Sequence, residues 1–214
     1  MNKQTFLTLL ATFVLLFSFT FSCSAKGKDK AKHVVFIGLD GWGAYSLPKA
    51  DMPNVKKLME DGSYTLKKRS ALPSSSAINW ASMFMGAGPE LHGYTEWGSK
   101  TPELPSRVLN KNGIFPTVFQ LLRDARPEAE IGCLYEWEGI KYLVDTLSLN
   151  YHYHVADCNK TPKELGNMSS SYIKEKHPAL VAICFDGPDH TGHTEGHARV
   201  CSHRCPLFHE PSWL

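Results

Sequence analysis

The sequence predicts an α/β fold in which a mostly parallel sheet is flanked by helices. Two continuous apolar segments, residues 33–40 and 179–186, have the length and composition of strands buried on both faces. Between them, segments with helical spacing of apolar residues alternate with shorter strand-like segments. This alternation indicates a doubly wound arrangement, in which ligands bind beyond the carboxyl ends of the strands.

The remaining elements follow from local signals. Helices are expected at 52–62, 76–86, 115–127 and 161–177. Weaker strands are expected at 63–72, 130–137 and 151–155. Ser76 is the expected N-cap of its helix, because a serine side chain can accept from the free amides of the first turn.

Length and charge narrow the function classes. A chain of 214 residues suggests one folded domain. Its 23 basic and 21 acidic side chains give a formal net charge of +2, with no basic patch for nucleic acid. Function must therefore come from a local site.

The N-terminus predicts export. Lys3 precedes an apolar stretch over 6–22, and small residues follow it, so residues 1–25 are typical of a signal peptide and 26–32 of a linker. Cleavage after Ala25 would release a soluble protein. Cleavage before Cys23 would leave a lipid anchor on that cysteine. The expected location is the periplasm, or the membrane or cell surface as a lipoprotein.

The cysteines do not form a disulfide framework. Cys184 lies in an apolar segment and is expected to be a buried thiol. Cys133 and Cys158 could pair in an oxidising compartment, which the sequence alone does not decide.

Two clusters of polar residues adjoin predicted strand and helix ends. Asp40 ends the first strand, where it could ligate a metal or accept hydrogen bonds from the next backbone amides. Ser74, Ser75 and Ser76 precede a helix, whose positive N-terminal end favours an anion or an alkoxide. They could equally be simple caps, and composition does not choose among them.

The third cluster is the sequence PDHTGHTEGH at 188–197. Asp189 and His193 are four residues apart, which places both around one ion in a turn or on one face of a helix. Carboxylate and imidazole ligands without a nearby cysteine suit Zn²⁺ or a similar divalent ion. His190 and His197 are weaker candidates, further from the ion or merely exposed.

Four motifs together resemble the type I phosphodiesterase/nucleotide pyrophosphatase branch of the alkaline phosphatase superfamily. They are IGLDG, PSSSAIN, GAGPELHG and PDHTGH, in the order of that family and over residues 33–197. The resemblance implies an alkaline phosphatase-like sheet. It also implies a hydrolase that cleaves phosphodiester or pyrophosphate bonds in a small phosphate ester or nucleotide.

The same resemblance assigns roles to individual positions. Ser76 falls at the nucleophile, and Asn79 at the residue that helps hold the phosphoryl oxygens. Asp40 and Ser76 would hold one of two divalent metal ions, expected to be Zn²⁺, and Asp189 and His193 the other. The implied reaction is a two-metal in-line displacement through a phosphoseryl intermediate.

Departures from the pattern leave alternatives open. Serine replaces the more common threonine, and Ile78 stands in the place of a proline. A phosphomonoesterase of the same superfamily, or a non-catalytic anion-binding module, therefore remains an alternative. Tyr94 and Trp97 could stack on a base, although packing is the simpler expectation.

Residues 198–214 form an atypical tail, rich in Cys, His and Arg. No aspartate follows Asp189, whereas the family has further metal ligands downstream. We therefore expect 33–197 to be the N-terminal part of a catalytic domain, incomplete at its C-terminus, with the reading frame lost near His197 and activity impaired. The alternative is a zinc site in the tail, formed by Cys201, His203, Cys205 and His209.

Overall fold

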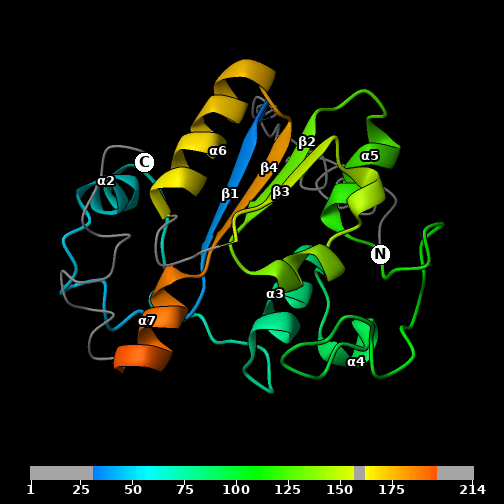
Figure 1. The fold of residues 1–214 in the computed structure, drawn as a ribbon, viewed down its shortest axis with the longest axis horizontal. Helices are drawn as coiled ribbons and strands as arrows, with labels where there is room; N and C mark the ends of the chain where they lie inside the picture. Colours follow the sequence, from blue (N-terminus) through cyan, green and yellow to red (C-terminus); the bar gives the residue numbers. More distant parts are fainter. Residues whose placement is uncertain (1–30, 157–161, 197–214) are drawn as a thin grey trace, which may run out of the picture. The chain divides into compact units, whose positions relative to one another are not determined.

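The computed structural model describes residues 31–156 and 162–196, and we describe the compact unit that begins at His33. The predicted signal sequence, Cys158, His197 and the tail lie outside the described residues. Four strands form one parallel sheet in the order β1-β4-β2-β3 (Figure 1). They are β1 (Val34–Leu39), β2 (Ile131–Tyr135), β3 (Tyr151–His154) and β4 (Leu180–Phe185). The predicted α/β fold with a parallel sheet is confirmed.

Helices connect these strands, as the alternating pattern predicts. They are α2 (Pro53–Asp61), α3 (Ser76–Met85), α4 (Pro89–His92), α5 (Val118–Ala125), α6 (Pro162–Lys176) and α7 (Gly187–Glu195). Two short 3₁₀ helices, η1 (Glu138–Tyr142) and η2 (Thr146–Ser148), lie between β2 and β3. The four predicted helices are confirmed to within a few residues at each end.

One face of the sheet packs against α3 and α5. Its core contains Trp80, Phe84 and Phe119 from these helices, packed on alternate residues of β2 and β4. Cys133 and Cys184 lie in this core as buried free thiols, which confirms the expectation for Cys184. The proposed partner of Cys133, Cys158, is outside the described residues.

The other face packs against α6. Its core joins Leu165 and Tyr172 of α6 to the opposite set of β4 residues, Val181, Ile183 and Phe185. Strand side chains alternate between the two faces, so β4 contributes to both cores and all six of its residues are buried. The sheet is thereby held between two helical layers (Figure 1).

Three sequence expectations are wrong. Residues 63–72 form no strand, because Lys67, Lys68 and Arg69 leave no apolar face and the segment is almost wholly exposed. The first strand, β1, is not buried on both faces: within the described chain it is an edge, and Val35 and Ile37 are 45% and 42% exposed. The N-cap of α3 is Ser75, and Ser76 is the first helical residue.

The segment after β4 shows whether Asp189 and His193 lie in a turn or on a helix. Residues 187–195 form the helix α7, which begins with Pro188 at an early position and carries Asp189 in its first turn. Asp189 and His193 consequently share one helix face. In the described part of the chain, no helix has the length and hydropathy needed to cross a membrane.

Candidate functional site

Acidic residues directly follow three neighbouring strands. Asp40 comes after β1, Asp186 after β4 and Glu136 after β2. Because the strands are parallel, all three lie at the carboxyl edge of the sheet, where ligands bind in such folds. Sequence analysis missed Asp186 and Glu136, although both show the signal that identified Asp40, an acidic residue at the end of an apolar strand.

Asp40 links β1 to α3. Its Oδ2 accepts a hydrogen bond of 2.9 Å from Nε1 of Trp80, and its Oδ1 accepts one of 2.9 Å from the amide of Gly41. Trp80 follows Ser76 by one helical turn, so the two side chains share a face of α3. The absence of a side chain at Gly38 makes room for this indole, because a Cβ there would lie 2.2 Å from the ring.

The turn after Asp40 lies against α7. A Cβ on Gly41 would lie 2.6 Å from Cα of Asp189, and Gly41 has φ of +66°, so only glycine fits there without strain. Nε2 of His193 lies 3.4 Å from Oδ2 of Asp189. Contacts from Trp80 to Asp40 and from Gly41 to Asp189 therefore bring the three sequence clusters to one edge of the sheet.

The structure distinguishes the three serines. Ser74 is exposed in the preceding loop, and its Oγ accepts from Ser70. Ser75 is the N-cap, but its side chain makes no capping bond, and its buried Oγ has no hydrogen-bond partner among the described residues. Ser76 opens the helix beside amides that Ser75 leaves uncapped, which suits an anion at this end of α3.

Asn79 is engaged with the backbone that precedes α3. Its Oδ1 accepts from the amide of Ala71 at 2.8 Å, and its Nδ2 donates to the carbonyl of Ser75 at 3.0 Å. The side chain thus fixes the loop that leads to Ser76. Its predicted contact with phosphoryl oxygens stays a prediction.

Burial raises the pKa of Asp186 to about 6. The negative charges of Asp40 and Asp189 add to this shift, while His193 opposes it. The amide of Asp186 donates to Oε2 of Glu136 at 2.7 Å, which ties the ends of β4 and β2 together. Accumulated negative charge at one edge favours a bound cation.

The donor chemistry at this edge fits a divalent ion only in part. Asp40, Asp189 and His193 are the oxygen and nitrogen donors that zinc accepts. Yet within residues 31–156 and 162–196, no group of three or more His, Cys, Asp or Glu side chains is arranged as a metal site. Of the predicted ligands, Asp189 and His193 lie as a pair, with Nε2 and Oδ2 3.4 Å apart, and they do not form a completed centre.

His92, in the motif GAGPELHG, is structural. It is fully buried, and its Nδ1 accepts from the amide of Tyr94, so Nε2 carries the proton and donates to Oγ of Ser82 at 3.1 Å. Burial lowers the pKa of His92, which keeps the ring neutral. Tyr94 is also buried and donates to the carbonyl of Tyr142, which confirms that it packs, whereas Trp97 is 66% exposed.

A family model matches most of the described chain. The model of type I phosphodiesterase / nucleotide pyrophosphatase matches residues 34–206. This range contains Asp40, Ser76, Asp189 and His193. No curated protein matched the chain.

Solved structures share the fold at low sequence identity. Inactive murine ectonucleotide pyrophosphatase/phosphodiesterase 5, in complex with AMP, is 15% identical, with a TM-score of 0.57 over 79% of this chain and 49% of its own. Phosphonoacetate hydrolase from Sinorhizobium meliloti 1021, in complex with phosphonoformate, is 18% identical, with a TM-score of 0.58 over 84% of this chain and 52% of its own. The chain thus spans about half the length of these structures.

Proposed function

Because the chain belongs to the type I phosphodiesterase / nucleotide pyrophosphatase family of the alkaline phosphatase superfamily, we propose that it is a phosphoester hydrolase with Ser76 as nucleophile. One observation carries the proposal: contacts between Trp80 and Asp40, and between Gly41 and Asp189, bring three distant motifs to one edge of the sheet. The solved relatives contain AMP or phosphonates, which supports a small nucleotide or phosphate ester as substrate.

The N-terminus of α3 is where the phosphoryl group of the substrate would bind and react. The backbone amides of the first turn of α3, which Ser75 leaves uncapped, would bind the phosphoryl oxygens. Oγ of Ser76 would attack the phosphorus of a diester and displace one alcohol, which takes up the hydroxyl proton. The serine would then carry the phosphoryl group with the second alcohol still esterified, and water would release it as a monoester. Asn79 positions this turn through its bonds to Ala71 and Ser75.

Asp40 and Ser76 would hold one divalent ion, and Asp189 and His193 a second, with Zn²⁺ as the expected metal. Such ions, when bound, would stabilise charge on the phosphoryl oxygens and lower the pKa of the serine hydroxyl. Asp186 and Glu136 add negative charge beside these ligands. Catalytic zinc sites use about three protein ligands, so two per ion implies weak binding by the described residues.

Diester and pyrophosphate bonds are the proposed targets, and a phosphomonoesterase is the alternative within the superfamily. The serine at position 76 is the feature that favours the monoesterase. A second alternative is a non-catalytic module that binds anions at the N-terminus of α3. The unpartnered Oγ of Ser75 and the uncapped amides beside it support this reading.

Turnover of bis(para-nitrophenyl) phosphate and para-nitrophenyl phosphate, with zinc or with a chelator, tests these readings. Because the described residues supply only two ligands to each ion, we expect slow zinc-dependent cleavage of the diester, and Ser76→Ala should reduce it to the background rate. Ser74→Ala is the matched control, because Ser74 is exposed in the loop outside the helix, and it should retain activity. Faster turnover of the monoester would favour the alternative.

Phosphate binding that a chelator does not change, with no turnover of either ester, would instead favour the non-catalytic module. Trapping the reaction in acid adds a direct readout, because the proposed mechanism leaves a nitrophenyl phosphoryl group from the diester, or phosphate from the monoester, on the peptide that contains Ser76. Zinc-dependent turnover that survives Ser76→Ala would refute the assignment of the nucleophile.

We further propose that the protein is exported, either released after cleavage at Ala25 or anchored by a lipid on Cys23. The basic and apolar N-terminal sequence supports this. Labelling of cells with a radioactive fatty acid separates the two forms, because only the lipoprotein takes up label, and Cys23→Ser abolishes it. Unprocessed protein in the cytoplasm would contradict both.

A further inference from the structure

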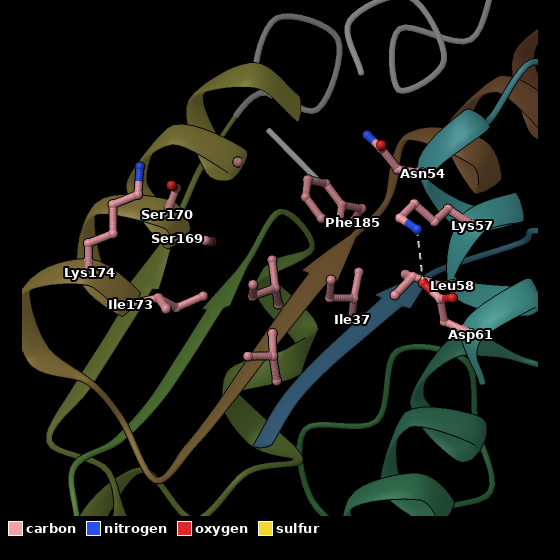
Figure 2. A pocket seen from close by; sticks show the side chains of 13 residues that line it. Ile37, Asn54, Lys57, Leu58, Asp61, Ser169, Ser170, Ile173, Lys174 and Phe185 are labelled. Atoms are coloured by element: carbon pink, nitrogen blue, oxygen red, sulfur yellow. Dashed lines mark hydrogen bonds and ion pairs between the residues drawn. The ribbon is translucent and has the colours of Figure 1, made fainter. Parts of the chain in front are cut away.

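A cavity of about 380 Å³ lies on the α6 face of the sheet, between α6 and α2. Its floor consists of apolar side chains of β1 and β4, Val35, Ile37, Ile183 and Phe185. Leu58 of α2 and Ile173 of α6 form opposite walls (Figure 2). This volume is within the range of roughly 300–1,000 Å³ that is typical of small-molecule sites.

The apolar lining is unusually exposed. Val35 and Ile37 are 45% and 42% exposed, and Leu58 is 63% exposed. In the described chain, α2 has no buried residue, so it flanks the cavity without closing it. Adjoining apolar side chains that stay this exposed mark a surface that gains stability when a ligand covers it.

The α6 wall of the same cavity is polar. Ser169 is 2% exposed, and its buried Oγ has no hydrogen-bond partner within the described residues. A buried hydroxyl without a partner costs free energy, which a ligand acceptor in the cavity would recover. Ser170 and Lys174 lie beside Ser169 along α6, as Figure 2 shows.

The charges at the rim favour an anion. Lys57 of α2 is neutralised by Asp61, whose Oδ2 lies 3.1 Å from the ammonium. Lys174 forms no ion pair among the residues that the structure describes, so it contributes the unbalanced positive charge on the α6 side. A single anionic head group beside Ser169 and Lys174 would complement this wall, while its apolar tail would cover Ile37 and Phe185.

We propose that this cavity binds a saturated fatty acid of medium length, with its carboxylate on the α6 wall and its alkyl chain on the floor formed by β1 and β4. A hydroxyl and an ammonium on one wall match the oxygens of a carboxylate. The apolar floor matches an alkyl chain and offers no partner for a second polar group. The site is on the face of the sheet opposite α3, so the proposal does not depend on the hydrolase assignment.

Calorimetric titration with decanoate, below the concentration at which it forms micelles, tests the proposal. We expect one saturable site, with binding abolished by Ile37→Trp, which fills the floor. Lys174→Gln should weaken binding roughly tenfold and remove most of its salt dependence, and Ser169→Ala should also weaken it. Decanol, which lacks the charge, should bind roughly tenfold more weakly than decanoate.

Two matched controls test whether decanoate binds in this cavity and not elsewhere on the protein. Lys176→Gln removes a neighbouring charge of α6 that lies outside the cavity lining, and Leu121→Trp enlarges an exposed apolar residue of α5. Both should bind decanoate like the parent protein, and thermal melts should show that every variant is folded. Binding that survives Ile37→Trp, or equal binding of decanol, would overturn the proposal. It would also be overturned by a dimer that Ile37→Trp dissociates, because a second copy would then cover the cavity.

Discussion

Nε1 of Trp80 donates a hydrogen bond of 2.9 Å to Oδ2 of Asp40, across forty positions of the sequence. The bond joins the end of β1 to the helix that begins with Ser76. It therefore sets the position of the predicted metal ligand relative to the predicted nucleophile. The indole is 3% exposed and packs on Phe84, so the donor is held in place by the core.

Trp80→Phe should remove this bond and keep most of the packing. A hydrogen bond to a charged group contributes about 1.5–3 kcal/mol, so the free energy of unfolding should fall by roughly that amount. Urea denaturation checks the value. Trp97→Phe is the control, because Trp97 is 66% exposed, and its effect should stay within about 0.5 kcal/mol. If the two changes lower the free energy of unfolding equally, the hydrogen bond from Trp80 to Asp40 does not contribute to stability.

Gly41→Ala should destabilise the site more than its backbone angle alone requires. Gly41 and Gly86 have φ of +66° and +61°, but only at Gly41 would a new Cβ meet the backbone of Asp189. Left-handed strain costs roughly 1–3 kcal/mol at each position. Thermal melts should give a lower melting temperature for Gly41→Ala than for Gly86→Ala. Matching melting temperatures would show that β1 does not abut α7.

Asp186→Asn should stabilise the protein at neutral pH in the absence of metal. The pKa of Asp186 is raised from 3.8 to about 6 in the folded state, so the folded protein holds this proton more tightly than the unfolded chain. Stability from this group is complete below pH 4 and is lost as pH rises through about 6. The asparagine variant avoids that loss.

The expected gain for Asp186→Asn is roughly 1–3 kcal/mol at pH 7.5 and close to zero at pH 3.5. Denaturant titrations at the two pH values measure it. Asn can also act as an N-cap, so helix α7 should remain. A variant that is less stable than the parent at pH 7.5 would contradict the accumulation of negative charge at this edge.

His92 should make the protein sensitive to acid. Burial lowers the pKa of His92 below its usual 6.5, so the unfolded chain takes up this proton more readily. The contribution to stability is therefore present above pH 6.5 and is lost as pH falls below it. His92→Gln should flatten this part of the pH profile of the melting temperature and cost roughly 1–3 kcal/mol at pH 8, because the bonds to Ser82 and Tyr94 are disturbed. If His92→Gln leaves the pH profile of the melting temperature unchanged, His92 does not cause the loss of stability in acid.

The fold was predictable because its signals are local. Apolar strands such as 179–186, and helices bounded by Pro53 and Gly62, depend on residues close in sequence. Segment 63–72 has some residues typical of a strand, but its three consecutive basic side chains leave it no apolar face to pack on the sheet. Whether a strand lies in the centre or at the edge of a sheet depends on tertiary pairing, so the exposure of β1 could not be read from its apolar sequence.

The site was predictable in part for the same reason. Motif order identified Asp40, Ser76, Asp189 and His193, but it did not show how they are held. The bond from Trp80 to Asp40 and the close approach of Gly41 to Asp189 are tertiary contacts with no local signature. Asp186 and Glu136 were overlooked because a single acidic residue after a strand is common. Their significance appears only when the sheet order places them beside Asp40.

Anomalous X-ray diffraction from crystals soaked with zinc and phosphate tests the central claim most directly. The claim is that Asp40, Ser76 and Asp189 meet at one edge of the sheet. We predict zinc bound beside Asp40 or between Asp189 and His193, with phosphate at the N-terminus of α3 next to Oγ of Ser76. Zinc bound only elsewhere, or side chains of Asp40, Ser76 and Asp189 directed into separate crevices, would contradict it.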